Sequence, residues 1–137
     1  MIQLKHNEEK YNHVIFTNDN ILDLSFSKNI FDISYCKNTL HHMNNKEELN
    51  QLFDNLYNVS NKMIIVEIID PRTTGCLSRF LNTFLYNMYL KDSGKNYLTF
   101  SEFKKTIDKK FKNNCDINYL SFENILGKYM IAVIEKR

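Results

Sequence analysis

The chain has 137 residues, 43% of them hydrophobic and 13% aromatic, so it can bury one apolar core and fold as a globular domain. Its net charge of +2 gives no reason to expect a nucleic-acid partner, and its three cysteines include no close pair that would indicate a disulfide framework. No apolar run approaches the ~20 residues of a membrane span, and the first residues lack the apolar core of a signal peptide. We therefore expect a cytoplasmic protein that binds neither nucleic acid nor membrane.

The first part of the chain predicts two short strands. His13–Phe16 is a β-prone run followed by a turn at Asn18–Asn20, and Phe31–Cys36 has the β-branched, aromatic and small residues of a buried strand. The sequence becomes polar from Lys37. Because ligands of open α/β sheets bind at the carboxyl ends of strands, Cys36–His42 is the first candidate ligand edge and Asn18–Asn20 is the second.

An amphipathic helix is predicted next. Asn44 with Glu47 resembles a capping box, and Asn61 with Lys62 is expected to end the helix. The apolar residues fall on one stripe: Leu49, Leu52, Phe53, Leu56 and Val59.

The near-continuous apolar run Met63–Ile69 predicts a central parallel strand that is covered on both faces. A right-handed crossover places the carboxyl ends of two parallel strands at the same edge of a sheet. We therefore expect Cys36–His42 and Glu67–Arg72 to be neighbours.

The remainder of the chain predicts two helices and two strands. Cys76–Lys91 has a broad apolar face that either packs on the core or covers a substrate pocket. Thr99 and Glu102 form a capping box at the start of the next helix, whose large apolar residues recur every four positions, at Phe103, Ile107 and Phe111. A short turn joins Cys115–Phe122 to Lys128–Glu135, so these strands should pair antiparallel. A lysine cluster on the predicted helix is read as solvated surface rather than as a nucleic-acid footprint: Lys104, Lys105, Lys109, Lys110 and Lys112.

This order of elements, with the segments Asn20–Phe26 and Phe31–His42, resembles class I S-adenosylmethionine-dependent methyltransferases of the small-molecule type. The most specific part is Phe31-Asp32 followed, after seven residues, by Leu40-His41-His42 ahead of the helix. The resemblance implies an α/β fold with a partial Rossmann-like sheet of about five strands, flanked by helices. It corresponds to the later part of the family's fold, so we expect residues 1–137 to form one N-terminally incomplete domain.

The family binds the methionine part of S-adenosylmethionine on a glycine-rich turn, whereas all three glycines here lie at or beyond Gly75. Two hypotheses follow. The chain transfers a methyl group from S-adenosylmethionine to a small-molecule acceptor, or it is a non-catalytic remnant or interaction subunit that no longer binds the cofactor alone. In both, we expect the exposed edge of the Phe31 strand to be covered. Either the early strand His13–Phe16 moves across to pair with Phe31–Cys36, or a second chain or a second copy forming a dimer covers it.

The resemblance carries five cofactor-binding positions over to this sequence. Asn20 stands where the family has an Asp that accepts a hydrogen bond from the adenine amino group, and Ile21 follows at the adenine ring. Cys36 and Lys37 match the strand end that lines the methionine and ribose side, and Leu40 matches a residue packed near adenine. Asn20 is equally consistent with a turn residue, and Leu40 with core packing.

His41 is a candidate general base for methyl transfer, and His42, Arg72 and Tyr97 are candidate contacts for the acceptor. The alternative places one histidine in a loop cap and the other on the surface, with Arg72 and Tyr97 facing solvent. Adjacent histidines rarely face the same way, and no Cys or carboxylate stands at a ligand-like spacing, so we expect no metal site.

Overall fold

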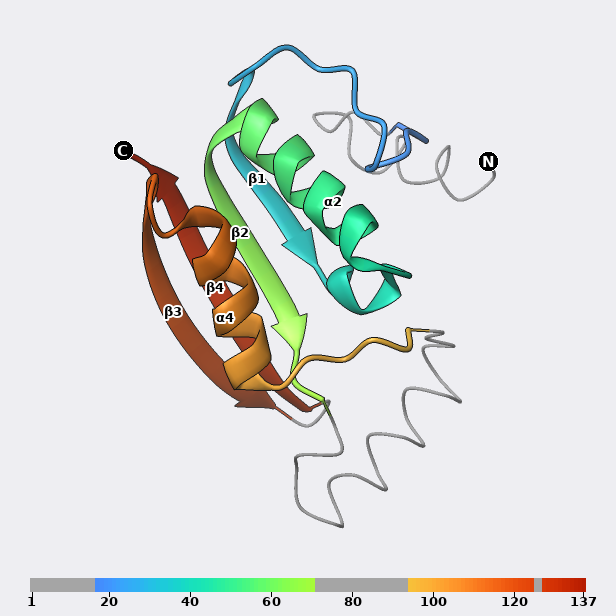
Figure 1. Cartoon of the computed structure of the whole chain (residues 1–137), viewed down its shortest axis with the longest axis vertical. Coiled ribbons are helices and arrows are strands. Elements are labelled where there is room, and N and C mark those ends of the chain that lie inside the picture. The colour runs from blue at the N-terminus through green and yellow to red at the C-terminus, as the bar shows by residue number, and fades with distance from the viewer. Residues whose placement is uncertain (1–16, 71–93, 125–126) are drawn as a thin grey trace.

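The computed structural model describes residues 17–70, 94–124 and 127–137. In these residues two helices cover one face of a four-stranded sheet whose order is β1-β2-β4-β3 (Figure 1). The elements are β1 (Phe31–Lys37), the 3-10 turn η1 (Leu40–His42), α2 (Lys46–Val59), β2 (Ser60–Ile68), α4 (Phe100–Phe111), β3 (Cys115–Asn124) and β4 (Gly127–Lys136). The predicted α/β class and partial Rossmann-like sheet are confirmed.

Two predicted elements, the strand His13–Phe16 and the helix Cys76–Lys91, lie outside the described residues. The described part therefore has four of the roughly five strands that the sequence predicts. None of its helices is both long enough and apolar enough to cross a membrane.

The pairing of the strands confirms the predicted crossover. β1 and β2 are parallel, with Cys36 beside Ile65, so both strands end at the same edge of the sheet. β2 lies between β1 and β4, as expected for its two-faced apolar sequence. β4 pairs antiparallel with both β2 and β3, which confirms the closing hairpin.

The main core lies between the sheet and the two helices. α2 contributes Leu52, Phe53 and Leu56, and the ring of Phe53 meets that of Phe111 from α4 at 5.6 Å. The predicted helix stripe is thus confirmed, with Leu49 only half-buried at its end. On the other face of the sheet, a smaller cluster of buried residues comprises Val66, Ile68 and Tyr129.

Two boundaries differ from the sequence predictions, the cap of α2 and the start of β2. The cap of α2 is Asn45 rather than Asn44, because Asn45 Oδ1 accepts the Glu48 N–H while the Glu48 carboxylate holds Asn44. The helix ends at Val59, before Asn61 as predicted, but β2 starts at Ser60 and so already includes Asn61 and Lys62.

β1 was predicted to be a buried strand, and this is wrong for one of its faces. Ile33 and Tyr35 are exposed, while Cys36 is buried. The cause is that side chains alternate between the two faces of a strand, so Ile33 and Tyr35 lie on the face opposite to Cys36, which neither described helix covers.

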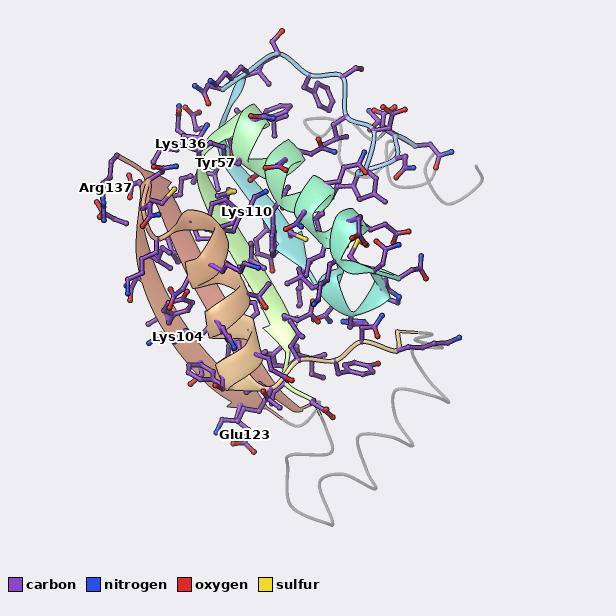
Figure 2. All side chains as sticks on the ribbon, in the orientation of Figure 1. Tyr57, Lys104, Lys110, Glu123, Lys136 and Arg137 are labelled. Carbon is purple, nitrogen blue, oxygen red and sulfur yellow. The ribbon has the colours of Figure 1, made fainter. Side chains whose placement is uncertain are left out.

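Side-chain contacts tie the ends of the helices to neighbouring elements (Figure 2). Lys110 of α4 forms an ion pair of 2.7 Å with Asp54 of α2. Lys136 at the end of β4 lies 4.3 Å from the ring centroid of Tyr57 in α2. These contacts fix the two helices in place over the same face of the sheet.

Replacing Thr99 with alanine should destabilise the protein by about 1 kcal/mol, because Thr99 and Glu102 form a complete capping box at the start of α4. Urea unfolding of Thr99→Ala measures the loss. The neighbouring Ser101 is exposed, so Ser101→Ala is the matched control and should change stability by less than about 0.5 kcal/mol. Equal effects of the two substitutions would argue against the capping role.

Candidate functional site

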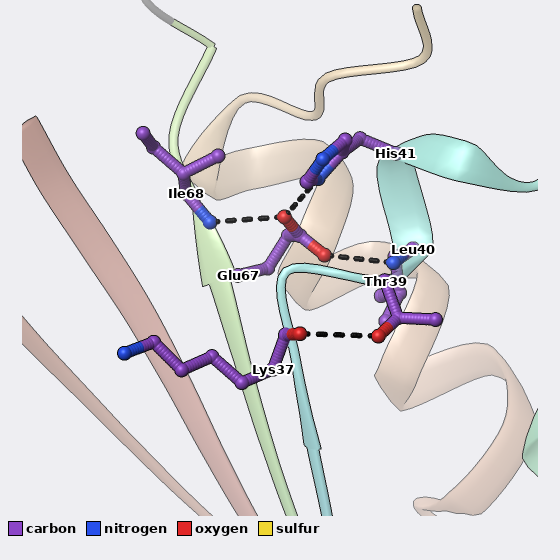
Figure 3. Close-up of polar contacts among 6 residues, drawn as sticks. All are labelled: Lys37, Thr39, Leu40, His41, Glu67 and Ile68. Atoms are coloured by element: carbon purple, nitrogen blue, oxygen red, sulfur yellow. Dashed lines mark hydrogen bonds and ion pairs between the residues drawn. The ribbon is translucent and has the colours of Figure 1, made fainter. Parts of the chain in front are cut away.

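The carboxylate of Glu67 joins the ends of β1 and β2. Its Oε2 accepts the backbone N–H of Leu40 at 2.8 Å, and its Oε1 accepts the N–H of Ile68 at 3.1 Å (Figure 3). Oε1 also lies 2.5 Å from His41 Nδ1. Because a carboxylate can only accept hydrogen bonds, the proton of this contact belongs to Nδ1. Glu67 is fully buried, so it holds η1 firmly against the end of β2.

The ring of His41 is enclosed on several sides. Tyr97 stacks on it at 4.7 Å with an interplanar angle of 14°, and the ring of His42 lies 4.3 Å away. Gly94 approaches so closely that an added Cβ would meet His41 Cδ2 at 1.9 Å. His41 is only 1% exposed, and because these contacts fix its ring, they also fix the orientation of η1.

Residues 95–98, which precede α4, also bind η1 through hydrogen bonds. The backbone N–H groups of Lys95 and Asn96 both donate to the His41 carbonyl at 3.1 Å, and Asn96 Nδ2 donates to the Met43 carbonyl at 2.7 Å. Leu98 bridges to Ile69 just after β2. Segments far apart in the sequence therefore converge at the edge where the parallel strands end, as predicted for Cys36–His42 and Glu67.

Asn38 is the residue at this edge that has an unsatisfied polar atom. Its φ of 51° is in the left-handed region, which asparagine tolerates better than most residues. Its N–H donates to the Val66 carbonyl at 2.9 Å, which fixes the backbone at the end of β1. Its side-chain Oδ1 is buried and has no hydrogen-bond partner within the part of the chain that the structure describes. Buried acceptors of this kind are costly, and a ligand with a hydrogen-bond donor would satisfy it.

The predicted cofactor residues of β1 differ in exposure. Cys36 is buried. Burial is the main cause that raises the pKa of its thiol, so the thiol stays protonated at neutral pH. Lys37 is exposed, and its side chain extends away from Glu67 (Figure 3). Leu40 is buried in the main core and offers its backbone N–H to Glu67.

The turn predicted to bind adenine lies beside α2. Asn20 is exposed, and its Oδ1 accepts the N–H of Leu22 at 3.0 Å, which is the bond expected of a turn residue. Asn55 of α2 donates to the Ile21 carbonyl at 2.8 Å. No hydrogen bond or ring contact joins Asn20 or Ile21 to Cys36–His42 among the described residues.

The predicted acceptor contacts fall into three groups. Tyr97 lies at the site, half-buried against His41. His42 follows His41 in η1, and its side chain is exposed. Arg72 lies outside the described residues.

Sequence reasoning missed Glu67 as a site residue and did not single out Asn38. Glu67 carried a usable signal, because it is the one charged residue inside the apolar run Met63–Ile69. A carboxylate buried in such a strand requires donors nearby, and the polar stretch after the neighbouring parallel strand was the place to find them. Asn38 carried no comparable signal, since asparagine is abundant in this sequence.

A hollow of about 640 Å³ lies on the helix side of η1. Its lining includes the apolar residues Leu40, Met43 and Leu98 and four lysines, of which Lys110 is paired with Asp54. The lysines are Lys46, Lys105, Lys109 and Lys110. The volume is within the range of small-molecule sites.

No family model matches this sequence, and no curated protein matches it. Several solved structures match the fold. Magnesium protoporphyrin IX methyltransferase from Synechocystis PCC 6803, solved with bound SAH, aligns with a TM-score of 0.59 and 14% identity over 97% of this chain and 57% of its own. A possible histamine N-methyltransferase from Thermotoga maritima gives 0.62 and 12%, over 97% of this chain and 70% of its own. The PH0226 protein from Pyrococcus horikoshii OT3 gives 0.62 and 14%, over 97% and 65%.

These likenesses show that the chain has a methyltransferase-like fold, as the resemblance in the sequence implied. The chain spans 65% of the length of the PH0226 protein and 57% of the Synechocystis enzyme.

Proposed function

We propose that this chain binds S-adenosylmethionine at the carboxyl ends of β1 and β2 and takes part in methyl transfer to a small-molecule acceptor. The observation that carries the proposal is the buried Oδ1 of Asn38 at the end of β1, which has no hydrogen-bond partner among residues 17–70, 94–124 and 127–137. The ribose hydroxyls and the ammonium group of the cofactor are donors that such an oxygen accepts. When bound, the cofactor supplies the methyl group, and the chain orients it and excludes water.

In this proposal Asn38 contacts the cofactor, and Glu67 with His41 fixes the backbone that presents Asn38. Because the His41 ring is buried and bound to Glu67, we assign it a positioning role in place of general base. Tyr97 extends the same assembly toward the acceptor. The free thiols of Cys36 and Cys115 fit the cytoplasmic location that we propose.

The hollow beside η1 supports the proposal that the acceptor is a small molecule. Its lining of apolar residues and lysines suits a small anion with an apolar body. Among the structural neighbours, the Synechocystis enzyme is named for a magnesium porphyrin and the Thermotoga protein for histamine. A 640 Å³ hollow can hold a molecule of drug-like size.

A second candidate function is a non-catalytic subunit that keeps the fold without binding the cofactor. It is favoured by Asn20, whose Oδ1 accepts the Leu22 N–H and so serves the turn. For the 137-residue chain we expect a dissociation constant no better than about 1 mM. Saturable binding at that level supports the first function, and the absence of binding supports the second.

Substituting Asn38 tests the proposed contact. Asn38→Ala should weaken binding of S-adenosylhomocysteine about tenfold, the effect of one lost hydrogen bond. Ligand-observed NMR detects binding in this weak range. Asn61→Ala, at an exposed position of β2, is the matched control and should bind as the unchanged chain does. Equal affinity of the Asn38 variant and the unchanged chain would remove Asn38 from the site.

A further inference from the structure

The hollow beside η1 lies between the first half of α2 and the side of α4 that faces it. Its apolar lining comes from four side chains, those of Leu40, Met43, Leu49 and Leu98. Its volume of about 640 Å³ is far larger than a single inorganic ion needs. A ligand that fills the hollow therefore has an organic body that packs against these apolar side chains.

Three of the four lysines in the lining have no acidic partner in the part of the chain that the structure describes. Lys110 is paired with Asp54 at 2.7 Å, whereas Lys46, Lys105 and Lys109 form no ion pair there. None of the described residues that line the hollow is a carboxylate. Lys105 and Lys109 also stand four positions apart on α4, a spacing at which like charges repel each other. An anion bound in the hollow would relieve this repulsion.

The acidic residues next to these lysines along the two helices bind other groups or face away. Glu48 and Glu102 accept hydrogen bonds at the N-terminal ends of α2 and α4. Asp108 accepts the hydroxyl of Tyr119 at 2.7 Å. Glu47 directly follows the lysine at the start of α2, and consecutive residues of a helix do not face each other. The positive charge of the hollow is therefore available to an anionic ligand.

We propose that the hollow binds a phosphate monoester, with its phosphate among Lys46, Lys105 and Lys109 and its organic part on the apolar lining. Such a phosphate carries about 1.5 to 2 negative charges at neutral pH, so it balances more of the lysine charge than a carboxylate does. Lysine binds phosphate as a point charge and needs no fixed fork geometry. Three flexible lysines from two helices suit this group.

The hollow also contacts the candidate cofactor site through η1. The side chain of Leu40 lines the hollow, while its N–H donates to the Glu67 carboxylate at 2.8 Å. Asn38 lies two residues earlier in the same turn region. The acceptor then belongs to the class of phosphorylated small molecules. This assignment of the acceptor rests on the proposed function, whereas the binding of a phosphate monoester does not.

Titration of phenyl phosphate into the ¹⁵N-labelled 137-residue chain, without cofactor, tests the site. We expect saturable amide shifts at Leu49, Thr106 and Lys109, with a dissociation constant below about 1 mM. Benzoate has a single charge and inorganic phosphate has no apolar body, so each should bind about tenfold more weakly. Phenol, which is neutral, should give no saturable shifts.

Substitutions on α4 show whether the lysines hold the phosphate. A chain with both Lys105→Gln and Lys109→Gln should bind phenyl phosphate about tenfold more weakly, because two partly exposed ion pairs are lost. Lys104→Gln is the matched control on the same helix. Its Nζ lies 5.3 Å from the ring centroid of Tyr119 on β3, whereas Lys110 extends toward α2 (Figure 2). The control should bind as the unchanged chain does, and circular dichroism checks that both variants are folded.

Three results would overturn the proposal. They are the absence of saturable phenyl phosphate binding, equal binding by the double variant and the unchanged chain, and inorganic phosphate or phenol binding as tightly as phenyl phosphate. A separate titration with S-adenosylhomocysteine distinguishes this outcome from a failure of the proposed function. A chain that binds phenyl phosphate but not S-adenosylhomocysteine keeps the phosphate site and loses the proposed function, and the opposite result does the reverse.

Discussion

Glu67→Ala should destabilise the protein by about 3 to 5 kcal/mol. The substitution removes the acceptor of three donors, the Leu40 and Ile68 N–H groups and the His41 ring, and leaves them buried. Each unsatisfied buried donor costs about 1 to 3 kcal/mol, so the sum is a large share of the stability of a small domain. Urea unfolding at neutral pH measures the change.

Two further substitutions make this result specific. Glu67→Gln keeps the shape and one carbonyl oxygen, so it should cost less than Glu67→Ala. Glu135 pairs with Lys62 at 3.0 Å on the surface, so Glu135→Ala should cost below about 1 kcal/mol. A Glu67→Ala protein as stable as the Glu135→Ala protein would show that the buried carboxylate does not hold η1.

Phe53→Ala should also cost about 3 to 5 kcal/mol, because a large core side chain is replaced by a cavity. Phe53 is 1% exposed and packs against Phe111, which ties α2 to α4 over the sheet. Phe100 begins α4 and is 41% exposed, so Phe100→Ala is the control and should cost far less. If the two substitutions had similar effects on the urea midpoint, Phe53 would not be the core residue described here.

The sequence was most informative where the determinants are local. The capping box at Thr99 and Glu102 and the buried spacing of Phe103, Ile107 and Phe111 lie within α4 itself, and all were predicted. The two-faced apolar run of β2 likewise predicted its central place in the sheet. Patterns with a fixed period report on a whole element and are little disturbed by one unusual residue.

Features that depend on distant parts of the chain were harder to predict. Whether a face of β1 is covered depends on which elements pack against the sheet, so the exposure of Tyr35 does not follow from its own sequence. The contact of Glu67 with His41 joins residues 26 positions apart. The shift of the α2 cap from Asn44 to Asn45 has a local cause. Glu48 bonds both asparagines, but only Asn45 accepts its backbone N–H, and the sequence pattern alone does not distinguish the two.

The predicted meeting of the two strand ends is confirmed, whereas the roles of the predicted site residues stay predictions. The carboxyl ends of β1 and β2 do meet, and Cys36, Leu40 and His41 all lie there. Asn20 and Ile21 lie in a turn bonded to α2, and their part in adenine binding stays a prediction. The sequence implied the fold by resemblance, and the structure adds the acceptor atom of Asn38 to the site.

We propose that a cofactor nucleoside binds at the carboxyl end of β1. Amide ¹H–¹⁵N correlation spectra, recorded while S-adenosylhomocysteine is titrated into the labelled chain, provide the test. We expect saturable shifts at Cys36, Asn38 and Leu40, with a dissociation constant of about 1 mM. Saturable shifts confined to residues away from this edge, or no shifts at all, would contradict it.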